Sequence, residues 1–222
     1  MKSTLLNMVL VLFGITLVAS AGVGAVNMLT EGAIKEAEEN AKNAALLAVL
    51  PEFNDKTQET VEVDGRTAVV YTALAADKSV VGYAVEATSP KGFSGDVVLM
   101  VGFTPEGKIR NVNVLKQTET PGLGTKMTEE GNNLIKSVKD VNPSDMKLVD
   151  GHIKVVKDYG SVDALTAATI SSRAYTDALD CAWAAYKIVA SSGTSVEETA
   201  AEEIADAEAE QTVTEEGGNN EE

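Results

Sequence analysis

The sequence predicts an α+β protein, in which an antiparallel sheet with flanking helices follows one N-terminal transmembrane helix and precedes a disordered, acidic C-terminal tail. Three observations lead to this class. An uncharged, mostly apolar stretch covers residues 3–30. Short runs rich in β-branched residues, separated by turn signals, occupy residues 60–116. A segment with helical periodicity follows, and from residue 193 the composition is too polar to bury a core.

The charge of the chain excludes some classes of partner. The formal net charge is -16, which argues against binding to nucleic acid or to anionic lipid surfaces. Eleven acidic residues and no basic ones lie between Ser191 and Glu222. The chain has one cysteine, Cys181, and one histidine, His152, so it has no intramolecular disulfide and no pattern of a Cys/His metal site. We expect His152 to be a structural or surface residue.

The apolar stretch at the N-terminus is long enough to cross a membrane as a helix. Lys2 precedes it and Glu31 is the first charge after it, so the positive-inside tendency places the N-terminus in the cytoplasm and the rest of the chain outside. The alternative is a cleaved signal peptide, with residues 5–18 as its apolar core and 19–21 as a small-residue cleavage site. The continuation of the apolar run beyond residue 21 favours a retained anchor.

These features divide the chain into three parts. Residues 1–30 form the membrane anchor, residues 31–192 an extracytoplasmic domain, and residues 193–222 the acidic tail. The domain is expected to begin with a helix that continues from the anchor over residues 31–50 and stops at Pro51.

The central part of the domain is predicted to form strands. Segments 60–63 and 66–74 flank Asp64-Gly65, a two-residue hairpin signal. A third strand is expected over 79–89, and the nearly continuous apolar run 95–103 predicts a central strand that forms a second hairpin with 109–116.

The remaining elements are a loop, two helices and one strand. A loop over 117–126 contains Pro121, Gly122 and Gly124, and a short helix is expected over 128–139. We expect a last strand over 152–160. Apolar residues at spacings of three and four then predict an amphipathic helix over 172–192.

Four hydroxyl residues precede this last helix, namely Thr166, Thr169, Ser171 and Ser172. One interpretation is a helix cap, in which Ser171 or Ser172 accepts a free backbone N–H. The other is a phosphate site, because small residues allow close approach and a helix N-terminus favours anions. The residue pattern by itself leaves both open.

Two motifs carry a resemblance to a known family. Residues 163–169, Asp-Ala-Leu-Thr-Ala-Ala-Thr, are similar to the flavinylation motif of the FMN-binding domain family, in which Asp is followed by two variable positions, Ser or Thr, usually Gly, then Ala and Thr. Ala167 stands where the family usually has Gly. Residues 117–126 contain Glu-Thr-Pro-Gly-Leu-Gly, which resembles the loop beside the flavin in the same family. The two motifs occur in the family's order.

The resemblance implies covalently bound FMN, attached to Thr169 through a phosphoester bond that a dedicated flavin transferase makes. Ser171, two positions further on, is the alternative acceptor. The resemblance implies roles for further residues: Asp163 as a feature read by the transferase, and Thr166, Ala167 and Ala168 as the turn around the phosphate.

The second motif would contact the flavin ring. Thr120, Gly122 and Leu123 are expected to offer backbone and apolar contacts to the isoalloxazine, and Glu119 either bonds a ring edge or caps the loop. The resemblance thus implies a redox carrier in which no side chain acts as a catalyst.

Within the family, the chain most resembles the G subunits of Rnf-type complexes, which are ion-translocating ferredoxin:NAD+ oxidoreductases, and next the C subunits of Na+-translocating NADH:quinone reductases. This implies a single-pass flavoprotein of the cytoplasmic membrane that relays electrons to other integral membrane subunits. Two alternatives remain open. One is a stand-alone tethered flavin carrier with another acceptor, and the other is an anchored binding module without a cofactor.

The retained anchor is testable on the mature protein. Because residues 3–30 would stay buried in lipid, the protein should remain in the membrane fraction after washing with alkaline carbonate. Its intact mass should include the anchor. A mature N-terminus near Gly22 would contradict the anchor and support a cleaved signal peptide.

Overall fold

The computed structural model describes residues 5–192, and the predicted acidic tail, residues 193–222, lies outside the described residues. The chain divides into two compact units, residues 1–46 and residues 47–222. The division falls near the end of the first helix, so the first unit consists of helix and the second contains the sheet.

The first helix, α1 (Leu5–Val49), is uninterrupted and contains both the predicted anchor and the predicted helix that follows it. By length and composition it can cross a membrane, since its most apolar window has a mean hydropathy of 2.4. The helix ends just before Pro51, whose ring is incompatible with a continuing helix.

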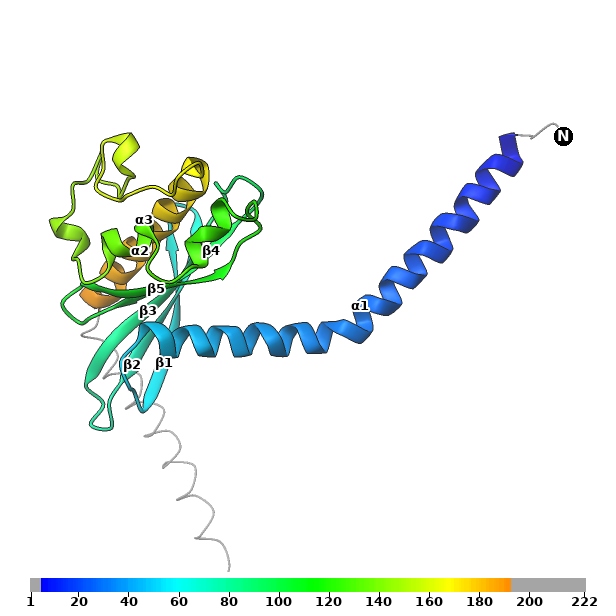
Figure 1. The fold of residues 1–222 in the computed structure, drawn as a ribbon. Coiled ribbons are helices and arrows are strands. Elements are labelled where there is room, and N and C mark those ends of the chain that lie inside the picture. Colours follow the sequence, from blue (N-terminus) through cyan, green and yellow to red (C-terminus); the bar gives the residue numbers. More distant parts are fainter. Residues whose placement is uncertain (1–4, 193–222) are drawn as a thin grey trace, which may run out of the picture. The chain divides into compact units, whose positions relative to one another are not determined.

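The second unit is built on a five-stranded antiparallel sheet with the strands in sequence order (Figure 1). The strands are β1 (Asp55–Val63), β2 (Arg66–Leu74), β3 (Val80–Ser89), β4 (Val97–Phe103) and β5 (Ile109–Lys116). Both residues of the β1–β2 turn, Asp64 and Gly65, have positive φ (49° and 71°), as a type I′ hairpin requires. The five strands expected between residues 60 and 116 and both hairpins are therefore confirmed, and β1 begins at Asp55, before the expected start.

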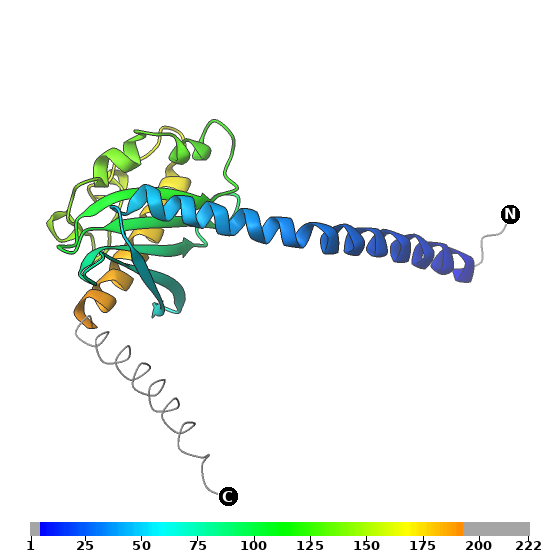
Figure 2. The same cartoon turned by 90° about the horizontal axis from the view of Figure 1, so that it is seen from below.

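One face of the sheet carries a row of valines. Val70, Val85, Val101 and Val112 lie opposite one another on neighbouring strands, from β2 to β5. The last helix, α3 (Thr169–Ser192), crosses this face and contacts β1 to β4 (Figures 1 and 2). The apolar stripe predicted from its sequence is buried, and this helix and sheet face together form the core.

The opposite face of the sheet receives residues 47–50. A Cβ on Gly102 of β4 would lie 2.2 Å from the carbonyl oxygen of Val49, so only glycine allows this approach. Asn111 of β5 donates a hydrogen bond to the carbonyl oxygen of Ala48 at 3.1 Å. Residues 47–50 of the second unit are thus held on β4 and β5 through their backbone carbonyl groups.

Short helical turns occupy the long segment between β5 and α3. They are η1 (Gly124–Thr128), α2 (Asn133–Val138), η2 (Pro143–Asp145) and η3 (Val156–Asp158). The α2 helix is the expected short helix, and the Asn132 side chain caps it by accepting the N–H of Ile135 at 3.1 Å.

The strand expected over residues 152–160 is wrong. The segment forms isolated bridges in place of a ladder, and its centre is the turn η3. Tyr159 has a left-handed φ of 67°, and a Cβ on Gly160 would lie 2.0 Å from the carbonyl oxygen of Lys154, so the chain closes on itself here. Ile153 and Val155 belong to a loop, and both side chains are buried. Their alternation with exposed or partly exposed residues gives the same sequence pattern as a strand.

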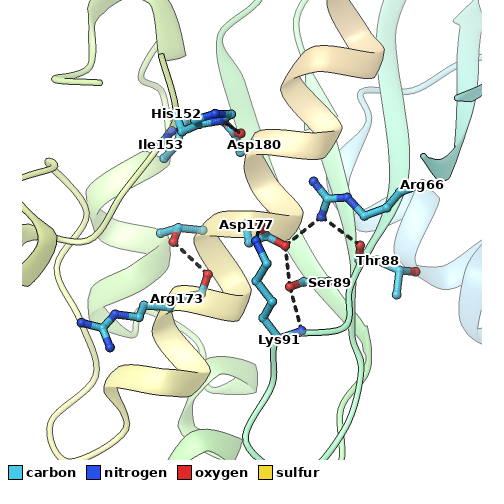
Figure 3. A network of polar contacts seen from close by, with 10 residues as sticks. Arg66, Thr88, Ser89, Lys91, His152, Ile153, Arg173, Asp177 and Asp180 are labelled. Carbon is cyan, nitrogen blue, oxygen red and sulfur yellow. Dashed lines mark hydrogen bonds and ion pairs between the residues drawn. The ribbon is translucent and has the colours of Figure 1, made fainter. Parts of the chain in front are cut away.

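A network of charged side chains joins α3 to the sheet (Figure 3). Asp177 of α3 accepts hydrogen bonds from Arg66 of β2, Ser89 of β3 and Lys91, each at 2.7 Å. One turn further along α3, Asp180 accepts the N–H of Ile153 at 2.9 Å and contacts His152 Nδ1 at 2.6 Å (Figure 3). These two carboxylates fix α3 relative to β2, to the end of β3 and to the loop that follows η2.

The Asp177 network predicts a pH dependence of stability. Burial alone would raise the pKa of Asp177, but hydrogen bonds from Lys91 and Ser89 and the charge of Arg66 outweigh burial and lower it. An aspartate whose pKa is lowered by folding stabilises the fold above its unfolded-state pKa of about 3.9, and this contribution is lost as the pH falls through the folded-state pKa.

We therefore expect Asp177→Asn to lower the free energy of unfolding by roughly 1–3 kcal/mol at pH 7, as for a lost hydrogen bond to a charged group. The difference from wild type should shrink below pH 4. Urea unfolding of the detergent-solubilised chain at pH 7, 4 and 3 measures this, with the exposed Asp96→Asn as the control. A difference that is constant or grows on acidification would contradict the assignment.

Candidate functional site

A cavity of about 320 Å³ lies beside the first turn of α3. This is at the small end of the range for ligand sites, roughly 300–1,000 Å³. Three segments line it: the loop after β3, the loop after β5, and the turn that leads into α3. The lining residues are Phe93, Glu119, Thr120, Leu123, Gly124, Ala167, Ala168, Thr169, Ile170 and Ser171.

The buried carboxylate of Glu119 connects these three segments. Only 4 % of the residue is exposed. One carboxylate oxygen accepts a hydrogen bond from Ser171 Oγ of α3 at 2.5 Å, and the other accepts the N–H of Ser94 at 3.3 Å. Because a buried carboxylate is costly without hydrogen-bond donors, these bonds hold the loops and the helix together.

Glycine allows the two loops to approach Glu119 closely. A Cβ on Gly124 would lie 2.5 Å from Ser171 Oγ and 2.6 Å from Glu119 Cβ. A Cβ on Gly92 would lie 2.6 Å from Glu119 Oε1 and 2.0 Å from the carbonyl oxygen of Gly95. Gly92 and Gly124 therefore let the backbone of both loops pack against this carboxylate.

The turn before α3 is tied to the helix by Ser172, which is fully buried. Its hydroxyl accepts the N–H of Leu165 at 2.9 Å and donates to the carbonyl oxygen of Ala168 at 2.8 Å. The helix begins at Thr169, so the expectation that Ser171 or Ser172 caps it is wrong. Both hydroxyls lie inside the first turn, where they bind Glu119 and the preceding turn.

Ala167 adopts a left-handed backbone conformation, with φ of 61°. Glycine takes this conformation without strain, whereas a Cβ makes it costly. Glycine is also the usual residue at this position in the motif that residues 163–169 resemble. The turn geometry is thus kept with alanine, at some cost in stability.

Thr169 is the first residue of α3 and stands at the edge of the cavity. Its Oγ1 accepts a hydrogen bond from Nζ of Lys157 at 2.8 Å. The N–H groups of the first helical turn have no carbonyl of the helix to bind, because the first intrahelical bond runs from Ser172 to Ala168. A hydroxyl, an ammonium group and a helix N-terminus therefore meet at one point, which suits an anion.

The structure brings most of the predicted site residues together. Those that line the cavity are Glu119, Thr120, Leu123, Ala167, Ala168, Thr169 and Ser171. Three predicted residues lie outside the lining. Asp163 and Thr166 are exposed on the turn, and Gly122 is exposed with φ of 75°.

Sequence reasoning missed four residues. Phe93, Gly124 and Ile170 complete the lining, and Lys157 contacts Thr169. Phe93 could have been found as an aromatic residue between the glycines of residues 92–95. Gly124 could have been found as the last glycine of the second motif. Lys157 was not placed at the site because residues 152–160 were expected to form a strand. Within residues 5–192, no group of three His, Cys, Asp or Glu side chains is arranged to hold a metal ion.

Comparison with known proteins defines the class of this domain. Residues 92–184 match the family model of the FMN-binding domain, which includes both cavity loops and most of α3. A solved structure of Shewanella oneidensis NqrC is similar with a TM-score of 0.42 and 21 % identity, over 56 % of this chain and 62 % of that one.

Longer similarity extends over most of the chain. The G subunit of the ion-translocating oxidoreductase complex of Shewanella amazonensis is 32 % identical, over 81 % of this chain and 86 % of that protein. The G subunit of the Na(+)-translocating ferredoxin:NAD(+) oxidoreductase complex of Acetobacterium woodii is 29 % identical, over 80 % and 89 %. The chain belongs to this family of G subunits, which contain an FMN-binding domain. Membership weighs against the cofactor-free binding module.

The strained turn gives a prediction on stability. Replacing Ala167 by glycine should relieve about 1–2 kcal/mol of left-handed strain. The greater freedom of glycine in the unfolded chain offsets about 0.4–1 kcal/mol of this gain. We expect a net increase in the free energy of unfolding of up to about 1.5 kcal/mol, measured by chemical denaturation.

Ala164→Gly is the matched control, since Ala164 lies in the same turn without a positive φ. That variant should lose about 0.4–1 kcal/mol. Equal destabilisation by both substitutions would show that the φ of residue 167 is not a source of strain.

Proposed function

We propose that this chain is the membrane-anchored flavoprotein subunit of an Rnf-type complex, that it carries FMN covalently on Thr169, and that it relays electrons. The observation that carries this proposal is the position of Thr169. The last residue of the flavinylation-like motif is the first residue of α3, beside an open cavity and next to a lysine ammonium group.

The contacts of the two candidate hydroxyls favour Thr169 over Ser171 as the acceptor. Ser171 is 3 % exposed, and its hydroxyl already donates to the Glu119 carboxylate. Thr169 is partly exposed, and its hydroxyl is held by Lys157 from the solvent side. A transferase can therefore approach Thr169 without opening the core.

The cavity provides suitable contacts for a flavin ring. Phe93, Leu123 and Ile170 are large apolar residues that line it and remain 65 %, 40 % and 46 % exposed. An exposed apolar rim around a partly polar cavity is typical of a ligand site. We assign Glu119 to holding the cavity wall, because both of its carboxylate oxygens already accept hydrogen bonds.

Bound FMN would supply the one- and two-electron chemistry, and the residues of the chain bind and orient it. A covalent tether keeps the effective concentration of the cofactor high where free FMN would dilute away. We infer that α1 anchors the domain on the extracytoplasmic side of the cytoplasmic membrane, where it exchanges electrons with other integral membrane subunits as ions are translocated. Exposed Asp163 is the residue that we expect the flavin transferase to read.

The test is the flavin content of variants produced together with a flavin transferase. Thr169→Ala should carry no covalent flavin while the domain remains folded, because a partly exposed hydroxyl contributes little to stability. Thr169→Ser should keep partial loading, since the nucleophilic hydroxyl survives. Fluorescence in denaturing gels and mapping of the flavin-bearing peptide by mass measure these outcomes.

Ser171→Ala is the matched control, because it removes a hydroxyl two residues away. It should keep the flavin, and leaving the buried Glu119 without its donor should cost about 1–3 kcal/mol of stability. Flavin on Thr169→Ala but not on Ser171→Ala would move the attachment site by two residues. A wild-type protein that never carries flavin would contradict the proposed function.

A further inference from the structure

The ammonium group of Lys157 contacts a neutral side chain in place of a carboxylate. Its Nζ donates to the neutral hydroxyl of Thr169 at 2.8 Å. A hydroxyl accepts the hydrogen bond but does not compensate the positive charge. Among residues 5–192, no carboxylate forms an ion pair with Lys157. Within this part of the chain, the ammonium group of Lys157 therefore lacks an anionic partner.

Two carboxylates of this region, Asp158 next to Lys157 in sequence and Glu119 in the cavity lining, have other partners. Asp158 binds Arg173 through two hydrogen bonds, at 2.7 Å to Nε and 2.6 Å to an Nη nitrogen, and these bonds lower the pKa of Asp158. Glu119 is directed to Ser171 and Ser94. Neither carboxylate neutralises Lys157.

The loop that carries Lys157 is closed by backbone contacts. The N–H of Val156 donates to the carbonyl oxygen of Val162 at 2.8 Å, and the N–H of Gly160 donates to Val155 at 3.0 Å. Gly160 lies too close to Lys154 for any side chain. The backbone that carries Lys157 is therefore held in place, and the exposed side chain extends from it toward Thr169.

We propose that Lys157 positions the phosphoryl group of FMN at Thr169: its ammonium group orients the free hydroxyl and, after attachment, pairs with the phosphodiester. The inference rests on the proposed function. The two non-bridging oxygens of the phosphodiester, which share one negative charge, are bonded to the same phosphorus as Thr169 Oγ1, so a donor within hydrogen-bond distance of Oγ1 lies within reach of them. The N–H groups at the start of α3 add donors to the same anion.

Attachment forms the bond from Thr169 Oγ1 to phosphorus and breaks the bond from phosphorus to the leaving group of a flavin nucleotide donor. The hydroxyl proton passes to a base of the transferase, because Lys157 as an ammonium group donates and cannot accept it. The chain's own contribution is a fixed hydroxyl and a positive charge beside the entering phosphoryl group.

The experiment compares Lys157→Gln, Lys157→Arg and the full-length wild type, each produced with a flavin transferase under limiting induction. Lys147→Gln is the matched control, because Lys147 is an exposed lysine outside the cavity lining and its substitution loses the same charge. Two quantities are measured: flavin attached per chain over time, and the fluorescence anisotropy of the attached flavin. Melting temperatures show whether each variant is folded.

Lys157→Gln should attach flavin roughly tenfold more slowly, the factor expected for one hydrogen bond to a charged group. The flavin that is attached should have lower anisotropy, because its phosphate has lost its counter-charge. Lys157→Arg should recover most of both quantities, and Lys147→Gln should match the wild type. A merely structural role of Lys157 would change the melting temperature and would not be rescued through charge.

Two results would overturn the inference. One is a Lys157→Gln protein that equals the wild type in both rate and anisotropy. The other is a Lys157→Arg protein as impaired as Lys157→Gln, which would remove the role of charge. If the wild type carries flavin on Thr169 in these cases, the proposed function survives and the assignment of Lys157 fails. A wild type without flavin overturns both.

Discussion

The hydrogen bond between the buried carboxylate of Glu119 and the hydroxyl of Ser171 is the contact on which the candidate site depends. It joins a loop after β5 to the first turn of α3, 52 residues further along the chain. The second carboxylate oxygen binds the loop after β3. Because Glu119 is buried, loss of either donor would leave one of its carboxylate oxygens without a hydrogen bond. This one carboxylate therefore sets the separation of the three cavity walls.

The α3 helix makes that arrangement rigid, because it belongs both to the core and to the site. Its apolar stripe covers the valine row of the sheet, and its first residue is Thr169. Asp177, two turns further along, binds Lys91, which directly precedes the Gly92 loop of the cavity. The packing that stabilises the domain thus also positions Thr169, the proposed attachment point. A tethered cofactor needs this rigidity, since the tether fixes only one end of it.

The sequence predicted the elements whose signals are local, and failed where the partner is distant. The turn at Asp64-Gly65 and the amphipathic stripe of α3 follow from φ preference and periodicity. Ser171 was misread as a cap because its partner, Glu119, is remote in sequence and its own position does not encode that contact. Residues 152–160 alternate like a strand, although two buried residues in a closed loop produce the same pattern. Because of that error, Lys157 was not predicted to lie at the site. Its contact with Thr169 forms only when this loop is folded.

The central claim is that one surface of the domain holds FMN by a bond at Thr169 and by contacts in the cavity next to it. A structure of the flavin-loaded chain at a resolution that shows the cofactor tests this claim most directly. The account predicts continuous density from Thr169 Oγ1 through a phosphate near Lys157 Nζ to a ring that contacts Phe93 and Leu123. Flavin bonded to another hydroxyl, or a ring that lies entirely outside the cavity, would contradict it.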